Sequence, residues 1–193
     1  MEKSDSVTIS VPPWVDELGD RRARFETDDA RMALVIGLSQ RNVDEGGGPF
    51  AAAVFQGSRL VASGVNRVLA SGLSIAHGEI VALMRAQRFE RDDPQPEMEG
   101  TPYELFTSTE PCCQCFGALI WSGVARLVCA ATTADAESIG FDEGPKPDRW
   151  TDVLEKRGIA VQLGLHRAAA QQVLGDYARR GGPIYGLRHP TIR

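Results

Sequence analysis

Apolar positions in the first half of the chain follow a helical spacing, then a strand spacing, then a helical one again. Residues 27–43 repeat apolar side chains every three or four positions, which predicts an amphipathic helix with Thr27 as its N-cap. The segment FAAAVFQGSRLVASGVNRV that follows predicts two strands joined by a hairpin at residues 56–58. Helical spacing returns over residues 75–89. This half is therefore expected to fold as helix, hairpin and helix.

The second half of the chain alternates strands and helices in the same way. After the polar, proline-rich stretch RDDPQPEMEGTP, the segment ELFTST predicts a short strand and residues 112–121 predict a helix. ARLVCAAT predicts a buried strand, and the Gly- and Pro-rich residues 134–148 predict an irregular loop. The last predicted elements are a short helix over residues 150–156, a strand at AVQLGL and a helix over residues 166–180. Such alternation indicates an α/β sandwich around one central sheet.

The two ends of the chain are expected to lie outside this sandwich. Residues 1–24 predict an irregular N-terminal arm, because Pro12 and Pro13 interrupt any regular element. Residues 25–180 are expected to form one folded domain. Residues 181–193 are expected to form a C-terminal tail, in which the initial GGP supplies a hinge.

Length, charge and cysteine usage narrow the classes of protein to which the chain can belong. A chain of 193 residues suits one domain with a substantial core, and it has no run of about 18 apolar residues that would indicate a membrane span. A net charge of -5 and a pI near 5.3 argue against general nucleic-acid binding. The N-terminus lacks the layout of a secretory signal, and three of the four cysteines cluster at residues 112–115. This usage favours a reducing cytoplasm and a metal site over disulfides.

Two short motifs, HGE at residues 77–79 and PCCQC at residues 111–115, each open a predicted helix. Cys112 and Cys115 are three positions apart, so on a helix they lie on one face, within reach of one metal ion. With His77 they make a set of three zinc ligands that leaves a fourth position for water, as in catalytic zinc sites. The combined pattern H-x-E…P-C-x-x-C is the signature of the zinc deaminases.

Other interpretations of the cysteine cluster stay open on the residues alone. A lone C-x-x-C also occurs in redox pairs and in halves of structural zinc sites. A structural site needs a fourth ligand, but Cys129 lies in an apolar strand, His166 at a helix start and His189 in the tail. A thiol oxidoreductase would instead require a redox-active pair of Cys112 and Cys115 without zinc.

The same motifs predict a division of chemical roles around zinc. Zinc lowers the pKa of water, and Glu79 is placed to take the proton and to pass it to a ring nitrogen of an amine-bearing heterocycle. The backbone amide of Cys113, at the start of its helix, is expected to stabilise the oxygen added to that ring, while the Cys113 side chain belongs to the core. Pro111 suits the first turn of this helix and helps to orient Cys112.

Five segments carry a resemblance to a known family: GGPFAAAVF, GVNRV, AHGEI, TSTEPCCQCFGALIWSGV and ESIGFDEGP. The chain resembles the cytidine deaminase superfamily and, within it, the guanine deaminases. The resemblance implies a three-layer α/β/α sandwich with a central mixed sheet of about five strands. It also implies hydrolytic deamination of guanine to xanthine and ammonia, with Zn²⁺ as cofactor. The chain departs from the family at Gly78, where relatives usually carry alanine. The glycine is either tolerated or opens space beside the metal for a larger substrate.

The resemblance further implies which residues meet the substrate. Asn66 takes the place of an asparagine that binds the purine. Glu143, with Asp142 as its neighbour, takes the place of a second carboxylate that contacts the guanine amino group and assists its departure. Phe50 and Trp121 are candidates to wall the base.

Partners and substrates form the last set of expectations. In the guanine deaminases the C-terminal tail crosses to a partner subunit and closes its site, so Tyr177 and Tyr185 are candidates for that role in a homodimer. The ligand is expected to be a small aminated heterocycle, with no nucleic acid and no membrane involved. Open alternatives are deamination of ammeline or another aminotriazine, a pterin, a cytosine derivative or tRNA adenosine. A non-enzymatic alternative is a zinc-stabilised binding module.

Overall fold

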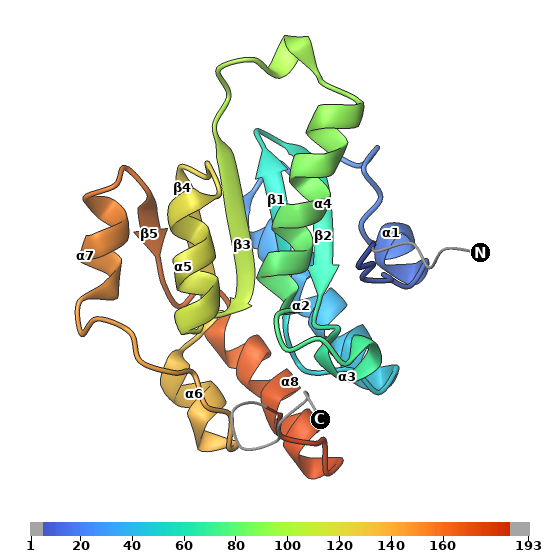
Figure 1. Ribbon diagram of the computed structural model, residues 1–193, viewed down its shortest axis with the longest axis vertical. Helices are drawn as coiled ribbons and strands as arrows, with labels where there is room; N and C mark the ends of the chain where they lie inside the picture. Colours follow the sequence, from blue (N-terminus) through green and yellow to red (C-terminus); the bar gives the residue numbers. More distant parts are fainter. Residues whose placement is uncertain (1–5, 186–193) are drawn as a thin grey trace.

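A five-stranded mixed sheet forms the centre of the fold (Figure 1). The structure, a computed structural model, describes residues 6–185, apart from the side chain of residue 97. The strands, in the spatial order β2-β1-β3-β4-β5, are β1 (Ala51–Gln56), β2 (Arg59–Val65), β3 (Tyr103–Thr109), β4 (Arg126–Ala131) and β5 (Ala160–Gln162). β1 pairs antiparallel with β2 and β3, whereas β3, β4 and β5 are parallel. The prediction of a mixed sheet of about five strands is confirmed.

Helices cover both faces of the sheet and make the fold three-layered (Figure 1). The long helices are α2 (Asp28–Asp44) and α8 (Arg167–Arg179) on one face, and α4 (Gly78–Asp92) and α5 (Cys113–Trp121) on the other. Each face has its own apolar cluster; one includes Met32, Phe106 and Leu174, and the other includes Leu83, Leu105 and Leu119. Because both faces are covered, β1 and β2 are buried along their whole length. The predicted α/β/α sandwich is confirmed.

Local signals fix where several elements begin. The Oγ1 of Thr27 accepts a hydrogen bond from the amide of Ala30 at 3.2 Å, so Thr27 is the N-cap of α2 as predicted. The hairpin between β1 and β2 turns at Gly57, whose φ of 56° lies in the region that favours glycine. α4 begins at Gly78, later than the predicted residue 75, and His77 takes the N-cap position with an extended backbone. This shift places His77 at the tip of the helix.

The segment between β4 and α7 (Trp150–Glu155), which was predicted to be irregular, contains a helix. Within the predicted loop, α6 (Thr133–Ser138) begins with a capping box: Oγ1 of Thr132 accepts from the amide of Asp135, whose carboxylate accepts from the amide of Thr132. The prediction of an irregular loop over residues 134–148 is wrong for residues 134–138. The T-x-x-D signal is present in the sequence, but a helix of 6 residues with one buried side chain shows no apolar period.

The N-terminal arm is not irregular throughout, because it contains α1 (Trp14–Leu18), which begins directly after Pro13. Val15 is fully buried, and Asp16 forms an ion pair of 2.5 Å with Arg85 of α4. The arm packs along β2, which is an edge strand of the sheet (Figure 1). It therefore covers a strand edge that would otherwise be free to pair with another chain.

The remaining elements are short: α3 (Val68–Ser71), the 3-10 turn Pro96–Met98 and α7 (Trp150–Glu155). None of the helices within residues 6–185 has the length and apolar character needed to cross a membrane.

Candidate active site

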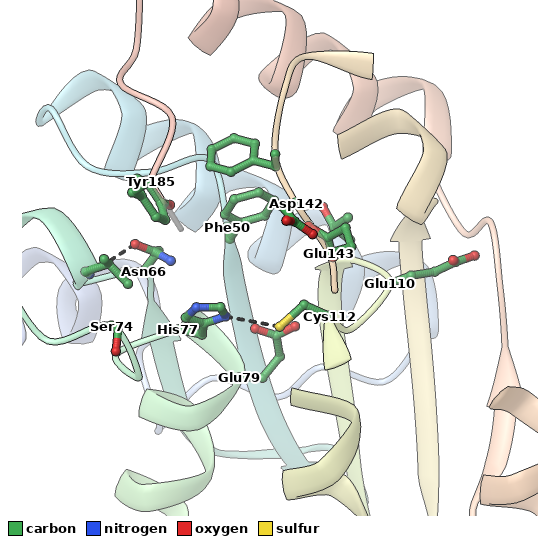
Figure 2. Close-up of a pocket in the computed structure, with 13 residues that line it drawn as sticks. Phe50, Asn66, Ser74, His77, Glu79, Glu110, Cys112, Asp142, Glu143 and Tyr185 are labelled. Carbon is green, nitrogen blue, oxygen red and sulfur yellow. Dashed lines mark hydrogen bonds between the residues drawn. The ribbon is translucent and has the colours of Figure 1, made fainter. Parts of the chain in front are cut away.

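α4 and α5 begin near each other at one end of the sheet, and a pocket lies at their N-terminal ends (Figure 2). Their N-cap residues, His77 and Cys112, both line this pocket. The loops that follow β2 and α6 supply further walls, and Tyr185 approaches from the C-terminal segment. Two helix N-termini at one pocket favour negative charge there, including thiolate and carboxylate groups.

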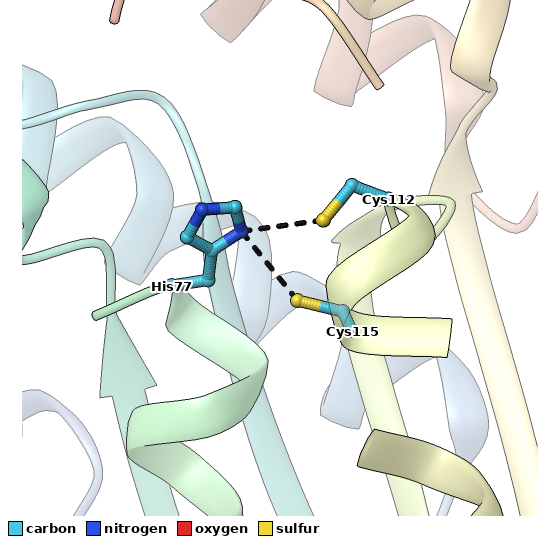
Figure 3. Close-up of side chains that lie close together, drawn as sticks. All are labelled: His77, Cys112 and Cys115. Atoms are coloured by element: carbon cyan, nitrogen blue, oxygen red, sulfur yellow. Dashed lines mark hydrogen bonds between the residues drawn. The ribbon is translucent and has the colours of Figure 1, made fainter. Parts of the chain in front are cut away.

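His77, Cys112 and Cys115 bring their ligand atoms within 4.8 Å of one another (Figure 3). Nδ1 of His77 lies 3.3 Å from Sγ of Cys112 and 3.6 Å from Sγ of Cys115. Tetrahedral zinc with a Zn–N bond of about 2.1 Å and a Zn–S bond of about 2.3 Å holds such nitrogen and sulfur atoms about 3.6 Å apart. The three donor atoms therefore fit one zinc ion and leave a fourth position open.

Hydrogen bonds within this cluster set the charges of its members. The hydrogen bonds from Cys115 and from His77 lower the pKa of Cys112 to about 4, against the opposing effect of burial. Burial opposes protonation of His77, but the contact with Cys112 raises the pKa of the imidazole. The hydrogen bond to Cys112 and burial raise the pKa of the Cys115 thiol. Cys112 is therefore the thiolate of the cluster, and His77 and Cys115 donate hydrogen bonds to it. A bound cation would replace the protons in these two hydrogen bonds.

Glu79 lies in the first turn of α4, beside the metal ligands but outside their set (Figure 2). Its side chain is buried, and this burial, together with the negative charge of Cys112, raises the pKa of the carboxyl. A raised pKa makes a carboxyl a stronger proton acceptor than an ordinary glutamate, which is the property that a general base requires. The position and the pKa of Glu79 thus suit a proton carrier.

Asn66, directly after β2, presents its side chain to the pocket in a fixed orientation (Figure 2). Its Oδ1 accepts a hydrogen bond from the amide of Val68 at 3.1 Å, which leaves Nδ2 as the group available to a ligand. The Asn66 backbone is held as well, because its carbonyl accepts from Nδ2 of Asn42 at 3.1 Å and its amide donates to the carbonyl of Phe50 at 2.9 Å. Asn66 therefore offers one N–H donor with a defined direction.

Glu143 reaches the pocket from the irregular segment that follows α6. Burial and the charge of Cys112 raise the pKa of Glu143 to about 8, so the carboxyl carries a proton at neutral pH. The Glu143 carbonyl accepts a hydrogen bond of 2.8 Å from the amide of Cys113, which joins this segment to the start of α5. Asp142 also lines the pocket, but it is exposed and its Oδ1 accepts from the amide of Gly144 at 2.9 Å.

Comparison with known proteins assigns this site to a family. The sequence profile of the cytidine and deoxycytidylate deaminase zinc-binding region matches residues 25–131. The chain belongs to this deaminase family. Because its three donors also fit the ion, the deaminase binds zinc through His77, Cys112 and Cys115.

Several relatives of the deaminase are guanine deaminases. The guanine deaminase of Bacillus subtilis (strain 168) is 33% identical over 117 residues, which are 58% of this chain and 69% of that protein. A crystallised guanine deaminase from Nitrosomonas europaea is 44% identical, with a TM-score of 0.84 over 93% of this chain and 100% of that one. A guanine deaminase in complex with 2,6-diaminopurine is 44% identical, with a TM-score of 0.85 over 97% and 100% of the two chains. Variants N66Q, N66A and E143D, also 43% to 44% identical to this chain, have been crystallised with 8-azaguanine.

Two substrate contacts predicted for the deaminase are wrong. The amide of Cys113 already donates to the carbonyl of Glu143, so it is not free to stabilise an oxygen on the substrate. The Cys113 side chain is directed toward Gly144, in agreement with the prediction that it is not a ligand. Trp121 does not line the pocket and is 84% exposed, because it ends a helix of 9 residues. At 1.5 Å per residue that helix carries Trp121 about 12 Å away from Cys113.

Of the two tyrosines considered for the tail, Tyr185 lines the pocket of the deaminase and Tyr177 does not. Tyr177 is a buried residue of α8, its ring stacks on Phe141 with centroids 5.9 Å apart, and its hydroxyl donates to the carbonyl of Pro183 at 2.6 Å. The prediction that Tyr177 closes a partner's site is therefore wrong. The rest of the predicted tail, residues 186–193 with His189, lies outside the described residues.

Five residues of the pocket wall were not predicted from the sequence: Val68, Ser74, Thr109, Glu110 and Phe141. Phe141 meets Phe50 edge to face with ring centroids 4.8 Å apart, and it meets Tyr185 in the same way at 5.1 Å. These rings form an aromatic wall of which only Phe50 and Tyr185 were predicted. The available signals were positional, because Phe141 stands within GFDEGP and Glu110 directly precedes PCCQC.

Gly78 does not enlarge the pocket of the deaminase. A Cβ at this position would lie 3.1 Å from Cα of Ala51 and 3.2 Å from the carbonyl oxygen of Phe50, so the absent methyl group faces the start of β1. Of the two alternatives for this glycine, the one in which it opens space beside the metal is therefore wrong. The glycine instead permits a close approach between α4, which carries Glu79, and the strand that follows Phe50.

The substitution Gly78→Ala is expected to loosen this contact, because β1 and α4 must separate by a few tenths of an ångström. We expect the free energy of unfolding to fall by about 1 kcal/mol and KM to rise because Phe50 shifts, with zinc content unchanged. Gly37→Ala is the matched control: no atom lies within 4 Å of its added Cβ, so it should stabilise α2 by up to about 1 kcal/mol. Urea unfolding and steady-state kinetics measure both. If both substitutions raised the free energy of unfolding by the same amount, the contact at Gly78 would have room for a methyl group.

Proposed function

We propose that the protein hydrolyses guanine to xanthine and ammonia. The observation that carries this proposal is the meeting of a zinc triad and the buried Glu79 with Asn66 and Glu143 in one pocket. Identity of 44% to a guanine deaminase over nearly the whole of both chains supports the same substrate. The pocket presents an amide donor, Asn66, on one wall and a carboxyl, Glu143, on another.

The zinc centre and Glu79 would supply the hydrolytic step. Zinc held by the three ligands is a Lewis acid that lowers the pKa of water at its open position. Glu79 accepts a proton from the attacking water and delivers it to the ring nitrogen next to the carbon under attack. Burial serves this role, because it raises the pKa of the Glu79 carboxyl and so favours its protonated form more than water would.

Glu143 and Asn66 would recognise the purine and assist the leaving group. The carboxyl of Glu143, protonated at neutral pH, has one oxygen that can accept from a ring N–H and a proton that can pass to the departing amine. Nδ2 of Asn66 donates to an acceptor on the purine, since its Oδ1 is already bonded to Val68. The aromatic wall of Phe50 and Phe141 supplies an apolar face for the base.

Substitutions in the relatives point to the same two residues. The variants crystallised with 8-azaguanine replace an asparagine at 66 and a glutamate at 143, which are the residue types and numbers of Asn66 and Glu143 in this chain. Ligands of the purine class are bound by those proteins. This correspondence supports a purine base as the substrate here.

We infer further that the active protein is a cytoplasmic homodimer built from an N-terminal arm, a deaminase domain and a tail. The four cysteines are free thiols, which suits a reducing compartment. The tail begins at Gly181, whose φ of 68° requires glycine, and it brings Tyr185 to the pocket rim. Exchange of such a segment between subunits would form a dimer with little change in contacts.

The substrate is tested by an ammonia-release screen of the zinc-loaded protein against guanine, ammeline, cytosine, adenine and their nucleosides. We expect guanine to respond, with release of xanthine. In the same screen Asn66→Ala should raise KM for guanine by about tenfold or more, because a buried hydrogen bond to the base is lost. Asn42→Ser is not a suitable control, because the Asn42 side chain holds the Asn66 backbone. Gln172→Ala is a better control, because Gln172 is exposed on α8 and does not line the pocket, so KM should stay unchanged. Response to nucleosides alone would contradict a base-sized pocket, and a zinc-binding protein without any ammonia release would be a binding module.

A further inference from the structure

Lys146 belongs neither to the zinc ligands nor to the pocket wall, yet it joins two parts of the site. Its Nζ donates to the carbonyl of Pro111 at 2.7 Å and to Oγ1 of Thr133 at 2.7 Å. The side chain is half-buried, and Nζ lies 5.2 Å from the centre of the Trp150 ring. Lys146 therefore connects the segment that carries Glu143 to the residue directly before the zinc ligand Cys112.

The segment that carries Glu143 needs such a connection, because residues 141–147 form no helix or strand. Within residues 6–185, two hydrogen bonds join this segment to residues 111–113. One is the bond from the amide of Cys113 to the carbonyl of Glu143, and the other is the bond from Lys146 to the carbonyl of Pro111. The side chain of Asp142 bonds within the segment itself and gives no outside support.

The Lys146 contacts close a ring of hydrogen bonds around the start of α5. Oγ1 of Thr133 donates to Oε2 of Glu110 at 2.8 Å, and the amide of Thr133 donates to the same oxygen at 3.0 Å. Since the single hydroxyl hydrogen of Thr133 goes to Glu110, its oxygen is free to accept from the ammonium of Lys146. Glu110 directly precedes Pro111 in the chain, and the Pro111 carbonyl is the other acceptor of the Lys146 ammonium. The ring of contacts therefore closes at Lys146.

An ammonium group suits this place better than a neutral side chain. It supplies donors to a carbonyl and to a hydroxyl at once, close to the carboxylate that the hydroxyl contacts. Its charge also acts on Glu143, where it lowers the pKa in opposition to burial. A methionine of similar length would fill the space but would leave the Pro111 carbonyl without this donor.

We propose that Lys146 is a positioning residue that fixes the Glu143 segment against the zinc-binding end of α5. This proposal rests on the proposed function of Glu143 in substrate binding. Lys146 acts through the placement of Glu143 and does not itself touch the substrate. Loss of the Lys146 bonds leaves a single main-chain bond between the two segments, so Glu143 becomes free to move relative to the zinc ligands.

The direct test is amide hydrogen exchange in the zinc-loaded protein. In Lys146→Met, exchange in peptides that cover residues 111–116 should become at least about tenfold faster, since the Cys113 amide loses the support of its acceptor. Lys146→Arg, which keeps a charged donor, should restore most of the protection. Lys156→Met, an exposed lysine at the end of α7, is the matched control and should change nothing. Unchanged exchange in Lys146→Met would overturn the proposal, whichever heterocycle proves to be the substrate.

The functional test is a double-mutant cycle with Glu143→Gln, measured on the heterocycle from which the wild-type protein releases ammonia fastest. Lys146→Met alone should lower kcat by about tenfold or more with one zinc retained per chain, and it should add little in the Glu143→Gln background. If the double variant instead lost kcat by the product of the two single-variant losses, Lys146 would not act through Glu143. A lower melting temperature with unchanged kcat and KM would reduce Lys146 to a structural role. Failure of guanine as a substrate would count against the proposed function and not against Lys146.

Discussion

Glu79→Gln is expected to lower kcat by about 10²- to 10⁴-fold, the range in which a general acid and base contributes to catalysis. Glutamine keeps the shape of the buried side chain but neither accepts nor releases a proton at neutral pH. Glu79 does not belong to the set of metal ligands, so the variant should bind zinc as the wild-type protein does. Substrate binding should change less than kcat, because the lost function is proton transfer during the reaction.

The measurement combines ammonia release with elemental analysis of the same protein samples. Glu137→Gln is a suitable control, because Glu137 is an exposed glutamate on α6 away from the pocket. Glu79→Asp adds a second comparison, since it retains an acid but withdraws it from the site by one methylene group. Wild-type kcat in Glu79→Gln would end the assignment of Glu79 as the proton carrier. Loss of zinc in this variant would instead mean that the carboxylate supports the metal.

Most of the fold was predictable because its larger elements are amphipathic or continuously apolar. The helix that begins after Thr27 and the hairpin at Gly57 appear where spacing and turn chemistry place them. The errors concern elements too short to show a period. Examples are α1 and α6, whose stability comes from contacts with distant segments. The ion pair of Asp16 with Arg85 is an example that no local pattern indicates.

The zinc site was predictable for a different reason. A spacing of three places Cys112 and Cys115 on one helix face, and the HGE motif places His77 at the start of another helix. The bond from the Cys113 amide to the Glu143 carbonyl was not predictable, since it joins an irregular segment to a helix start through main-chain atoms. The error for Trp121 was avoidable, because a helix that begins at the pocket leads its last residue away from it.

Cys115→Ser is expected to have the second large effect, on metal content and activity together. Cys115 is fully buried, and its Sγ is one of the three donors that fit zinc. A hydroxyl is a poor replacement for a thiolate at zinc, so the variant should retain well under one ion per chain after dialysis and should lose activity about 10³-fold or more. Cys113→Ser is the matched control, since that side chain faces Gly144 and should leave both quantities near wild type. Zinc loss in Cys113→Ser, or full occupancy in Cys115→Ser, would contradict the ligand set.

Zinc affinity of the wild-type protein should also rise with pH, which tests the ligand set without substitution. The pKa of the Cys115 thiol and the pKa of the His77 imidazole are both raised in the folded chain, so binding must displace protons from these groups. Competition for zinc with a chelator of known pH dependence, measured across the neutral range, gives the number of protons released. The metal should stabilise the fold by mass action, by about 4 kcal/mol at a free concentration 1,000 times Kd. The zinc ligands lie at the N-terminal ends of α4 and α5. Bound zinc would therefore hold these two helix ends together beside the pocket. A zinc affinity that is flat with pH would mean that the metal is held by groups other than His77 and Cys115.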